Sequence, residues 1–199
     1  MTTTTALHAA DIDDVVALHR RAFPDFFLSQ LGPNFLAQFY KGFLTDPTSV
    51  TVVAHGEDGR VLGAVVGTTQ PAGFFSRLLK RRLVGFAAAS AQAAIQDPKR
   101  IPRLARGILY RGEAGDRVEG ALLSSICVDP DTQGSGVGRA LIDAWCEAAR
   151  LRGARHAFLT TDAKNNEATN GFYQSNGWEL TKEFSTPEGR AMNRYEKDL

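Results

Sequence analysis

The chain has 199 residues, 43% of them hydrophobic and 23% charged, as is usual for a soluble globular protein with one buried core. Its formal net charge of +1 excludes a strong overall attraction to nucleic acid or to a membrane surface. No apolar run reaches the roughly 18 residues of a membrane span, and the N-terminus lacks the pattern of a signal peptide, so we expect a cytoplasmic protein.

The first 70 residues predict one strand, two helices and a hairpin. Asp11 is the expected N-cap of the first helix. The expected elements are a strand over residues 5–8, a helix over 11–23, a helix between Gly32-Pro33 and Pro47, and a β-hairpin over 49–70 about Glu57-Asp58-Gly59.

Residues 71–117, called the basic insert below, interrupt this pattern. They hold ten of the 23 basic residues and three of the 22 acidic ones, so the segment carries +7 and the remainder −6. We expect two helices here, separated by Asp97-Pro98. The interpretations are a solvated helical cap, a rim that attracts an anionic partner, or peripheral membrane contact through inserted Phe74, Phe75, Leu78 and Leu79.

From residue 119 onward, strands and helices alternate regularly. We expect a strand over 120–128, a helix over 137–152, a strand over 155–162, a helix over 165–177, and closing strands over 178–186 and 191–199. This order combines hairpins with one βαβ crossover. It predicts an α/β or α+β fold with a mixed sheet and helices on its faces, in a single domain over residues 1–199.

Three glycines in seven residues precede the helix expected at 137. Backbone N–H groups and the helix dipole at such a place can bind a phosphate, although a tight turn alone could also require glycine. A P-loop is excluded because Arg139-Ala140 stands where Lys and Ser or Thr are needed, and a dinucleotide fingerprint needs glycine at 139. The remaining pattern is Q/R-x-x-G-x-G/A, matched by Gln133, Gly136 and Gly138.

With this pattern, residues 124–161 resemble the acetyl-CoA motif of the GCN5-related N-acetyltransferase (GNAT) superfamily. A second stretch, residues 165–178, resembles the later family motif N-x-x-A-x-x-F/L-Y-x-x-x-G-F. It departs from that motif at Thr169, where alanine is usual, and at Trp178, where phenylalanine is usual. The resemblance is strong over residues 119–185 and covers the first 70 only in the order of elements. It implies a GNAT-like, mostly antiparallel central sheet flanked by helices.

The resemblance implies acetyl-CoA as co-substrate. Backbone amides of 133–139 would bind its pyrophosphate, and backbone groups of 126–128 would align its pantetheine arm and thioester carbonyl. The implied binding residues are Ile126, Cys127, Val128, Gln133, Gly134, Ser135, Gly136, Val137, Gly138, Arg139, Asn166 and Tyr173. The four histidines form no ligand pair in the sequence, so we expect no metal.

Acetyl transfer to an amine needs a neutral nitrogen, a stabilised oxyanion and a proton for the departing thiolate. Tyr173 is the expected proton donor because the ordinary pKa values of a phenol and a thiol are close, and packing on the sheet is the alternative role. Glu119 and Ser124, with Ser125, are the candidate bases. Relatives often carry glutamate at the place of Ser124, so a direct carboxylate base is in doubt. Cys127 is expected to be a core thiol rather than a nucleophile.

These observations predict an acetyl-CoA-dependent N-acetyltransferase. The acceptor would be a primary amine of a small molecule that could be anionic, such as a nucleotide-linked amino sugar. The alternatives are a non-catalytic CoA-binding sensor or interaction module of the same fold, and a protein N-acetyltransferase. No strong nucleic-acid signal is present, and both a monomer and a homodimer are open.

Overall fold

The computed structural model describes residues 2–24, 26–96, 119–187 and 189–199. One seven-stranded sheet runs through it in the order β1-β2-β3-β4-β5-β7-β6. Its strands are β1 (Thr3–Thr5), β2 (Ser49–His55), β3 (Val61–Thr68), β4 (Ala121–Val128), β5 (His156–Asp162), β6 (Glu179–Ser185) and β7 (Ala191–Asp198). The helices are α1 (Ile12–Ala22), α2 (Phe27–Gln30), α3 (Pro33–Thr45), α4 (Phe74–Arg81), α5 (Leu83–Gln96), α7 (Val137–Leu151) and α8 (Glu167–Ser175), with 3-10 turns η1 (Ala9–Asp11) and η3 (Pro130–Thr132).

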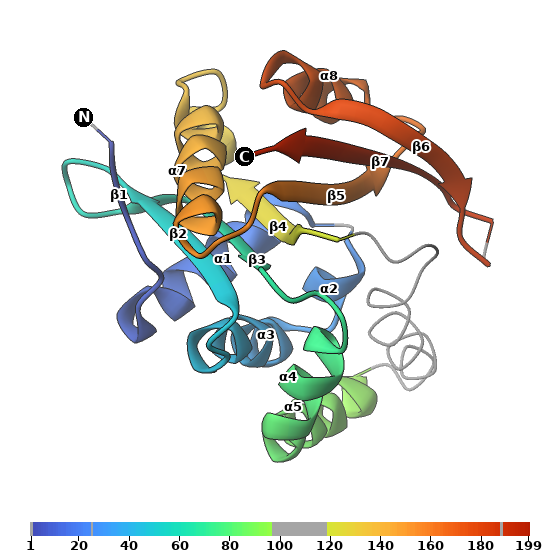
Figure 1. Ribbon diagram of the computed structural model, residues 1–199. Coiled ribbons are helices and arrows are strands. Elements are labelled where there is room, and N and C mark those ends of the chain that lie inside the picture. The colour runs from blue at the N-terminus through green and yellow to red at the C-terminus, as the bar shows by residue number, and fades with distance from the viewer. Residues whose placement is uncertain (1, 25, 97–118, 188) are drawn as a thin grey trace.

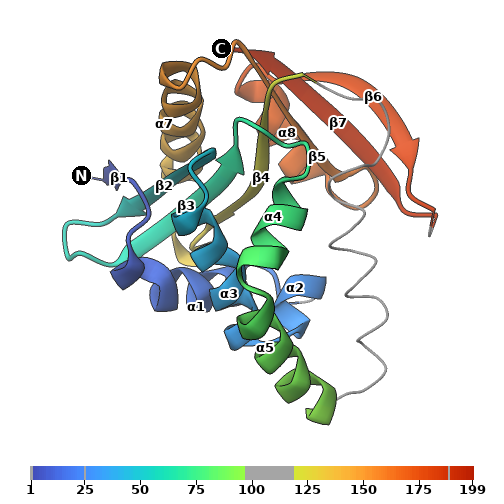
Figure 2. The ribbon, with the colours of Figure 1, turned by 60° about the horizontal axis from the view of Figure 1, so that its bottom comes forward.

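The helices cover the sheet from both sides, and each side has its own core (Figures 1 and 2). On one face, α1 and α3 pack with α4 against β2, β3 and β4 through apolar side chains that include Phe35, Leu36 and Phe74. On the other face, α7 and α8 bury Leu141, Trp145 and Tyr173 against the sheet. This arrangement confirms the predicted mixed α/β fold with a mostly antiparallel sheet.

β4 and β5 are the parallel neighbours of the sheet, joined through α7 as the predicted βαβ crossover requires. They pair only at Ala121↔Ala157 and Leu122↔Phe158. Beyond these two pairs the strands diverge (Figure 1). The residues of β4 from 123 to 128, except Ser124, therefore keep β3 as a partner on one side, and none of the six has a ladder partner on the side of β5.

A β-bulge lies in β4 beside this divergence. Val66 pairs with Ser125 and Gly67 pairs with Leu123, so Ser124 is the extra residue of β4. Bulges re-aim side chains and are common beside active sites. The pairing of β4 therefore marks the region around Ser124 as a candidate place for a functional site.

The predicted elements are confirmed from residue 33 to 68 and from 121 to 199 within a few residues at each end. The first strand is placed wrongly, because Thr3–Thr5 pairs with β2 and Leu7 is already buried in the core. Asp11 is the N-cap residue of α1, as predicted, but its side chain makes no cap hydrogen bond to α1. Its Oδ2 accepts a hydrogen bond at 2.8 Å from the backbone N–H of His8, three residues before it.

The helices of the basic insert differ from the prediction. The helical path is interrupted between α4 and α5 at Arg82, whose Nε donates a hydrogen bond to Gln38 Oε1 at 2.9 Å. The break expected at Asp97-Pro98 and the helix after it lie outside the described residues. The interpretation that four apolar side chains of α4 insert into a membrane is wrong. Phe74, Phe75 and Leu78 are buried in the protein, and Leu79 packs against the same core.

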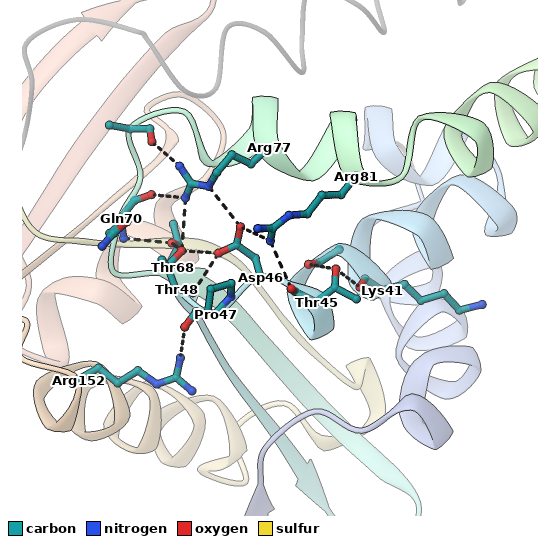
Figure 3. A network of polar contacts seen from close by, with 12 residues as sticks. Lys41, Thr45, Asp46, Pro47, Thr48, Thr68, Gln70, Arg77, Arg81 and Arg152 are labelled. Carbon is teal, nitrogen blue, oxygen red and sulfur yellow. Dashed lines mark hydrogen bonds and ion pairs between the residues drawn. The ribbon is translucent and has the colours of Figure 1, made fainter.

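α4 is held to the sheet by a buried carboxylate at the end of α3 (Figure 3). The side chain of Asp46 is 1% exposed and forms ion pairs with Arg77 Nε at 3.3 Å and Arg81 Nη1 at 3.1 Å. Thr48 donates to the same carboxylate from its backbone N–H and its hydroxyl. Two basic residues of the insert, 35% and 47% exposed, therefore share one buried carboxylate, which balances one of their two positive charges.

No helix among the described residues is both long enough and apolar enough to cross a membrane.

Candidate active site

A cavity of about 1940 Å³ opens where β4 and β5 diverge. The glycine half of the cavity is lined by β4, the segment 132–139 and α8. The aromatic half is lined by α1, α3, α4, α5 and the strands β5, β7 and β6. The phenylalanines of the aromatic half are Phe23, Phe26, Phe35, Phe39, Phe75, Phe86, Phe158 and Phe184.

The glycine segment presents bare backbone to the cavity. Gly134 and Gly136 have φ of +81° and +87°, and a Cβ at either position would meet no atom within 4 Å. They are therefore glycines for conformation and not for lack of space. Gly136 is also the N-cap of α7, so the N–H groups of residues 137–139 fall in the first turn, where no intrahelical acceptor exists. These groups and the helix dipole suit a phosphate.

Gly138 has a different role from the other two glycines. A Cβ there would approach Phe172 Cζ to 3.2 Å, so glycine allows α7 and α8 to come together. Asp129, which precedes the glycine segment and is 2% exposed, caps η3 by accepting a hydrogen bond from the backbone N–H of Asp131 at 3.1 Å. Asp129 also forms an ion pair with Arg21 of α1.

Most of the predicted binding residues meet at the cavity. Its lining includes Ile126, Val128, Gln133, Gly134, Gly136, Gly138, Arg139, Asn166 and Tyr173. Three do not line it: Cys127 is buried in the core on the α3 side, Val137 is buried against the sheet, and Ser135 Oγ donates to Thr132 O at 2.6 Å. The side chains of Cys127 and Val137 therefore cannot contact a ligand in the cavity, which leaves their backbone groups for binding, as the resemblance implies.

A family model described as an acetyltransferase (GNAT) domain matches residues 71–180, more than half of the chain. The chain belongs to the GNAT acetyltransferase family. The resemblance inferred from the two motifs is thereby confirmed, and members of this family use acetyl-CoA as the acetyl donor. The glycine segment, the free N–H groups of α7 and the diverging strands fit that co-substrate.

Solved structures share the fold of this acetyltransferase at low sequence identity. The ribosomal-protein-S18-alanine N-acetyltransferase of Escherichia coli is 16% identical with a TM-score of 0.59, over 100% of this chain and 94% of that one. The yncA protein of Salmonella typhimurium, solved with its cofactor acetyl-CoA, is 15% identical with a TM-score of 0.62 over the same shares. An N-acetyltransferase of Staphylococcus aureus Mu50 is 14% identical with a TM-score of 0.64, over 100% and 98%. No curated protein matches the chain.

Tyr173 lies in α8 of the acetyltransferase, at the cavity wall and 5% exposed. Its ring packs against Trp178 and Tyr195, with centroids 6.1 and 5.6 Å away. Burial raises the pKa of the phenol well above its ordinary value, so Tyr173 stays protonated at every pH near neutrality. The phenol is therefore in the protonated form that a donor needs and cannot act as a base, but its raised pKa no longer lies close to that of a thiol.

The other two predicted catalytic residues also face the cavity. Ser124 Oγ, at the bulge, is buried and has no hydrogen-bond partner among the described residues. Glu119 is exposed at the cavity edge, just before β4. Asn166 has a structural contact besides: its Nδ2 donates to Thr161 Oγ1 at 2.9 Å and to Asp162 O at 3.1 Å, which fixes the start of α8 on the end of β5.

His19 also belongs to this site and was not predicted from the sequence. It lines the aromatic half, and its Nδ1 lies 2.7 Å from Tyr40 Oη in the buried core. Burial raises the pKa of Tyr40, so its hydroxyl stays neutral beside Cys127. The signal was present in the sequence, since residue 19 continues the apolar stripe of Ile12, Val15 and Val16 along the inner face of the helix.

Cys127 is a core thiol, as predicted. Burial raises its pKa to about 12, so it carries no thiolate at neutral pH that could act as a nucleophile. No cluster of three metal-ligating side chains occurs in the ranges that the structure describes.

Proposed function

We propose that the protein transfers an acetyl group from acetyl-CoA to the primary amine of a small acceptor, directly and within a ternary complex. The observation that carries this proposal is the continuity of the cavity, which joins the glycine half to a second, aromatic half. Its volume of about 1940 Å³ exceeds the roughly 300–1000 Å³ of a site for one drug-sized ligand. It therefore has room for the arm of acetyl-CoA and for an acceptor together.

When bound in the gap between β4 and β5, acetyl-CoA supplies a thioester as the electrophile. Backbone N–H groups of β4 that lack a ladder partner stabilise the negative charge that develops on its carbonyl oxygen. Tyr173 donates its proton to the departing sulfur, because its phenol is kept neutral by burial. Glu119, at the edge of the same cavity, accepts the proton of the attacking amine through water.

Gly136→Ala is expected to raise the KM for acetyl-CoA about tenfold, because an alanine at a φ of +87° strains the turn that aims the first N–H groups of α7. Gly153→Ala is the matched control. Gly153 has a φ of +88°, an equally open surrounding and a place just beyond the other end of α7. Both variants should lose roughly 1 kcal/mol of stability, and only Gly136→Ala should lose affinity. Steady-state kinetics and thermal unfolding measure the two effects, and equal KM values would contradict the assigned phosphate site.

Glu119→Gln is expected to lower kcat about 100-fold with little change in the KM for acetyl-CoA, since it removes the group that takes up the amine proton. Glu179→Gln, at the exposed start of β6 and away from the cavity, is the control and should keep full activity. Steady-state rates with a saturating amine give both values. A Glu119→Gln enzyme with the rate of the wild type would refute this role and leave His19 as the next base to test.

The function is tested by thiol release from acetyl-CoA with a panel of amines. The panel holds small amines, aminoglycosides, nucleotide-linked amino sugars and peptides with free N-termini. Release with small amines supports the proposal, and release with peptides alone supports the protein N-acetyltransferase instead. Binding of CoA without release in any arm would identify a CoA-binding sensor or interaction module of the same fold.

A further inference from the structure

Arg194 is a buried cation in the middle of β7. It is 6% exposed and lines the cavity. Its neighbours along the strand, Asn193 and Tyr195, both donate hydrogen bonds to Asn170 of α8. Since successive side chains of a strand point to opposite faces, Arg194 points away from α8, toward the aromatic half of the cavity.

The guanidinium of Arg194 has no anionic partner within the described part of the chain. Its Nε is buried and forms no hydrogen bond, and its one described contact is the face of the Phe184 ring, 5.9 Å from the ring centroid. Arg190, which lines the same half, differs because its Nε and Nη2 donate to the two carboxylate oxygens of Asp162. The aromatic half therefore contains one neutralised arginine and one that is not neutralised.

An unpaired buried charge is costly, and arginine is almost never buried without a partner. An aromatic ring offers only a weak electrostatic contact compared with a carboxylate. Such a residue is explained if its partner arrives with the substrate. Resting on the proposed function, we propose that Arg194 binds a carboxylate of the acceptor, so that the acceptor is a small amine that also carries a carboxylate group.

Charge and shape favour a carboxylate over a phosphate. Arg194 provides a single uncompensated positive charge, and the apolar side chains of Phe158, Phe184 and Met192 line the same half of the cavity. This charge balances the one negative charge of a carboxylate, whereas the second negative charge of a phosphate would have no partner there. The planar fork of a guanidinium also matches the two oxygens of a carboxylate.

The position of Arg194 suits a short acceptor. Arg194 pairs in register with Thr160 of β5, and β5 itself borders the gap in which the thioester is to be held. One strand spacing is roughly 5 Å. An amine that is separated from its carboxylate by only a few bonds can therefore reach the gap while Arg194 holds the carboxylate.

The test compares acceptors that differ only in the carboxylate. L-phenylalanine, β-alanine and 4-aminobutyrate are each assayed beside the amine that lacks the carboxylate and beside the primary amide. The wild type should have a higher kcat/KM for the carboxylated member of at least one set. Arg194→Gln should lower that value about 10- to 100-fold and change the value for the uncharged members little.

Two further variants separate binding from general effects of charge or folding. Lys197→Gln removes a positive charge from the same strand outside the cavity and should keep the preference for a carboxylate. Arg194→Lys keeps the charge but not the fork, so it should retain part of the preference. Without ligand, Arg194→Gln should unfold at a higher temperature than the wild type, because it removes an unpaired buried charge. A structural role would produce the opposite shift.

Binding of carboxylates is also measured without turnover, as the rise in unfolding temperature with N-acetyl-phenylalanine, N-acetyl-β-alanine and 4-acetamidobutyrate in the presence of CoA. A rise in the wild type that is absent in Arg194→Gln supports the carboxylate site even if no amine is acetylated, in which case only the proposed transfer fails. Turnover of amines with no preference for a carboxylate overturns the role of Arg194 and leaves the transfer intact. Equal losses for charged and uncharged acceptors in Arg194→Gln overturn the role of Arg194 as well. If the protein neither acetylates any of the amines nor binds the carboxylates, both proposals are overturned.

Discussion

Tyr173→Phe is expected to lower kcat about 100- to 10,000-fold and to leave the affinity for acetyl-CoA nearly unchanged. The substitution removes only the hydroxyl, so the ring contacts with Trp178 and Tyr195 remain. Without a proton donor, the sulfur must depart as a bare thiolate in a cavity wall of low polarity. Steady-state kinetics combined with calorimetric binding of CoA separates the loss of rate from any loss of affinity.

The pH profile adds a second criterion for Tyr173. Because burial raises its pKa, the phenol is protonated throughout the neutral and mildly alkaline range, and its ionisation should not limit the rate there. Tyr195→Phe is the matched control, since Tyr195 belongs to the same aromatic cluster and donates to Asn170 Oδ1. That variant should keep most of its kcat. A Tyr173→Phe enzyme as fast as Tyr195→Phe would show that Tyr173 serves packing alone.

Asp46→Asn is expected to destabilise the protein by roughly 2–4 kcal/mol. An amide cannot balance Arg77 and Arg81, and it cannot accept from both of them and from Thr48 at once. The loss stays below that of a fully buried pair because both guanidinium groups retain contact with solvent. Chemical denaturation at neutral pH measures the difference.

The free energies of unfolding of the wild type and of Asp46→Asn should depend differently on pH in the acidic range. Burial acts to raise the pKa of Asp46, but hydrogen bonds from Thr48 and Arg77 outweigh it and hold the pKa below its ordinary value. The stabilisation is therefore complete above the pKa of an unfolded aspartate, about 3.9, and is lost as the pH falls below it. The difference between wild type and Asp46→Asn should be constant near neutral pH and shrink below about pH 4.

A surface ion pair provides the comparison for Asp46. Glu147 and Arg150 pair on the outside of α7, and the side chain of Glu147 is 52% exposed. Glu147→Gln should therefore change the stability little. If Asp46→Asn is equally mild at neutral pH, or if its deficit persists unchanged at pH 3, the carboxylate does not hold α4 in place as described.

The sequence predicted most of the secondary structure because its signals are local. The hairpin turn at Glu57-Asp58-Gly59, the Gly32-Pro33 helix start and the glycine segment each act within a few residues. The break at Arg82 could not be predicted in this way, because it depends on Gln38, which lies 44 residues away. The positions of the Arg77 and Arg81 guanidinium groups depend in the same manner on Asp46, which follows α3 and lies more than 30 residues away in the sequence.

Part of the candidate site also could not be predicted from neighbouring residues in the sequence. Register determines that Ser124 is the extra residue of a bulge and that Arg194 faces the cavity while Tyr195 does not. Neither follows from the alternation of a single strand, whose phase is fixed only by its partners. His19 could have been found from the helical stripe, but the stripe does not show that an aromatic cavity lies against it.

The two residue pairs that join β4 to β5 have a thermodynamic consequence. The strands β1 to β4 and the strands β5 to β7 form two blocks of one sheet, connected by a short seam and by α7. A co-substrate that bonds to both blocks would act as a bridge between them. The stability of the folded state should then rise with the occupancy of the gap, so that the concentration of acetyl-CoA sets how firmly the enzyme itself is held together.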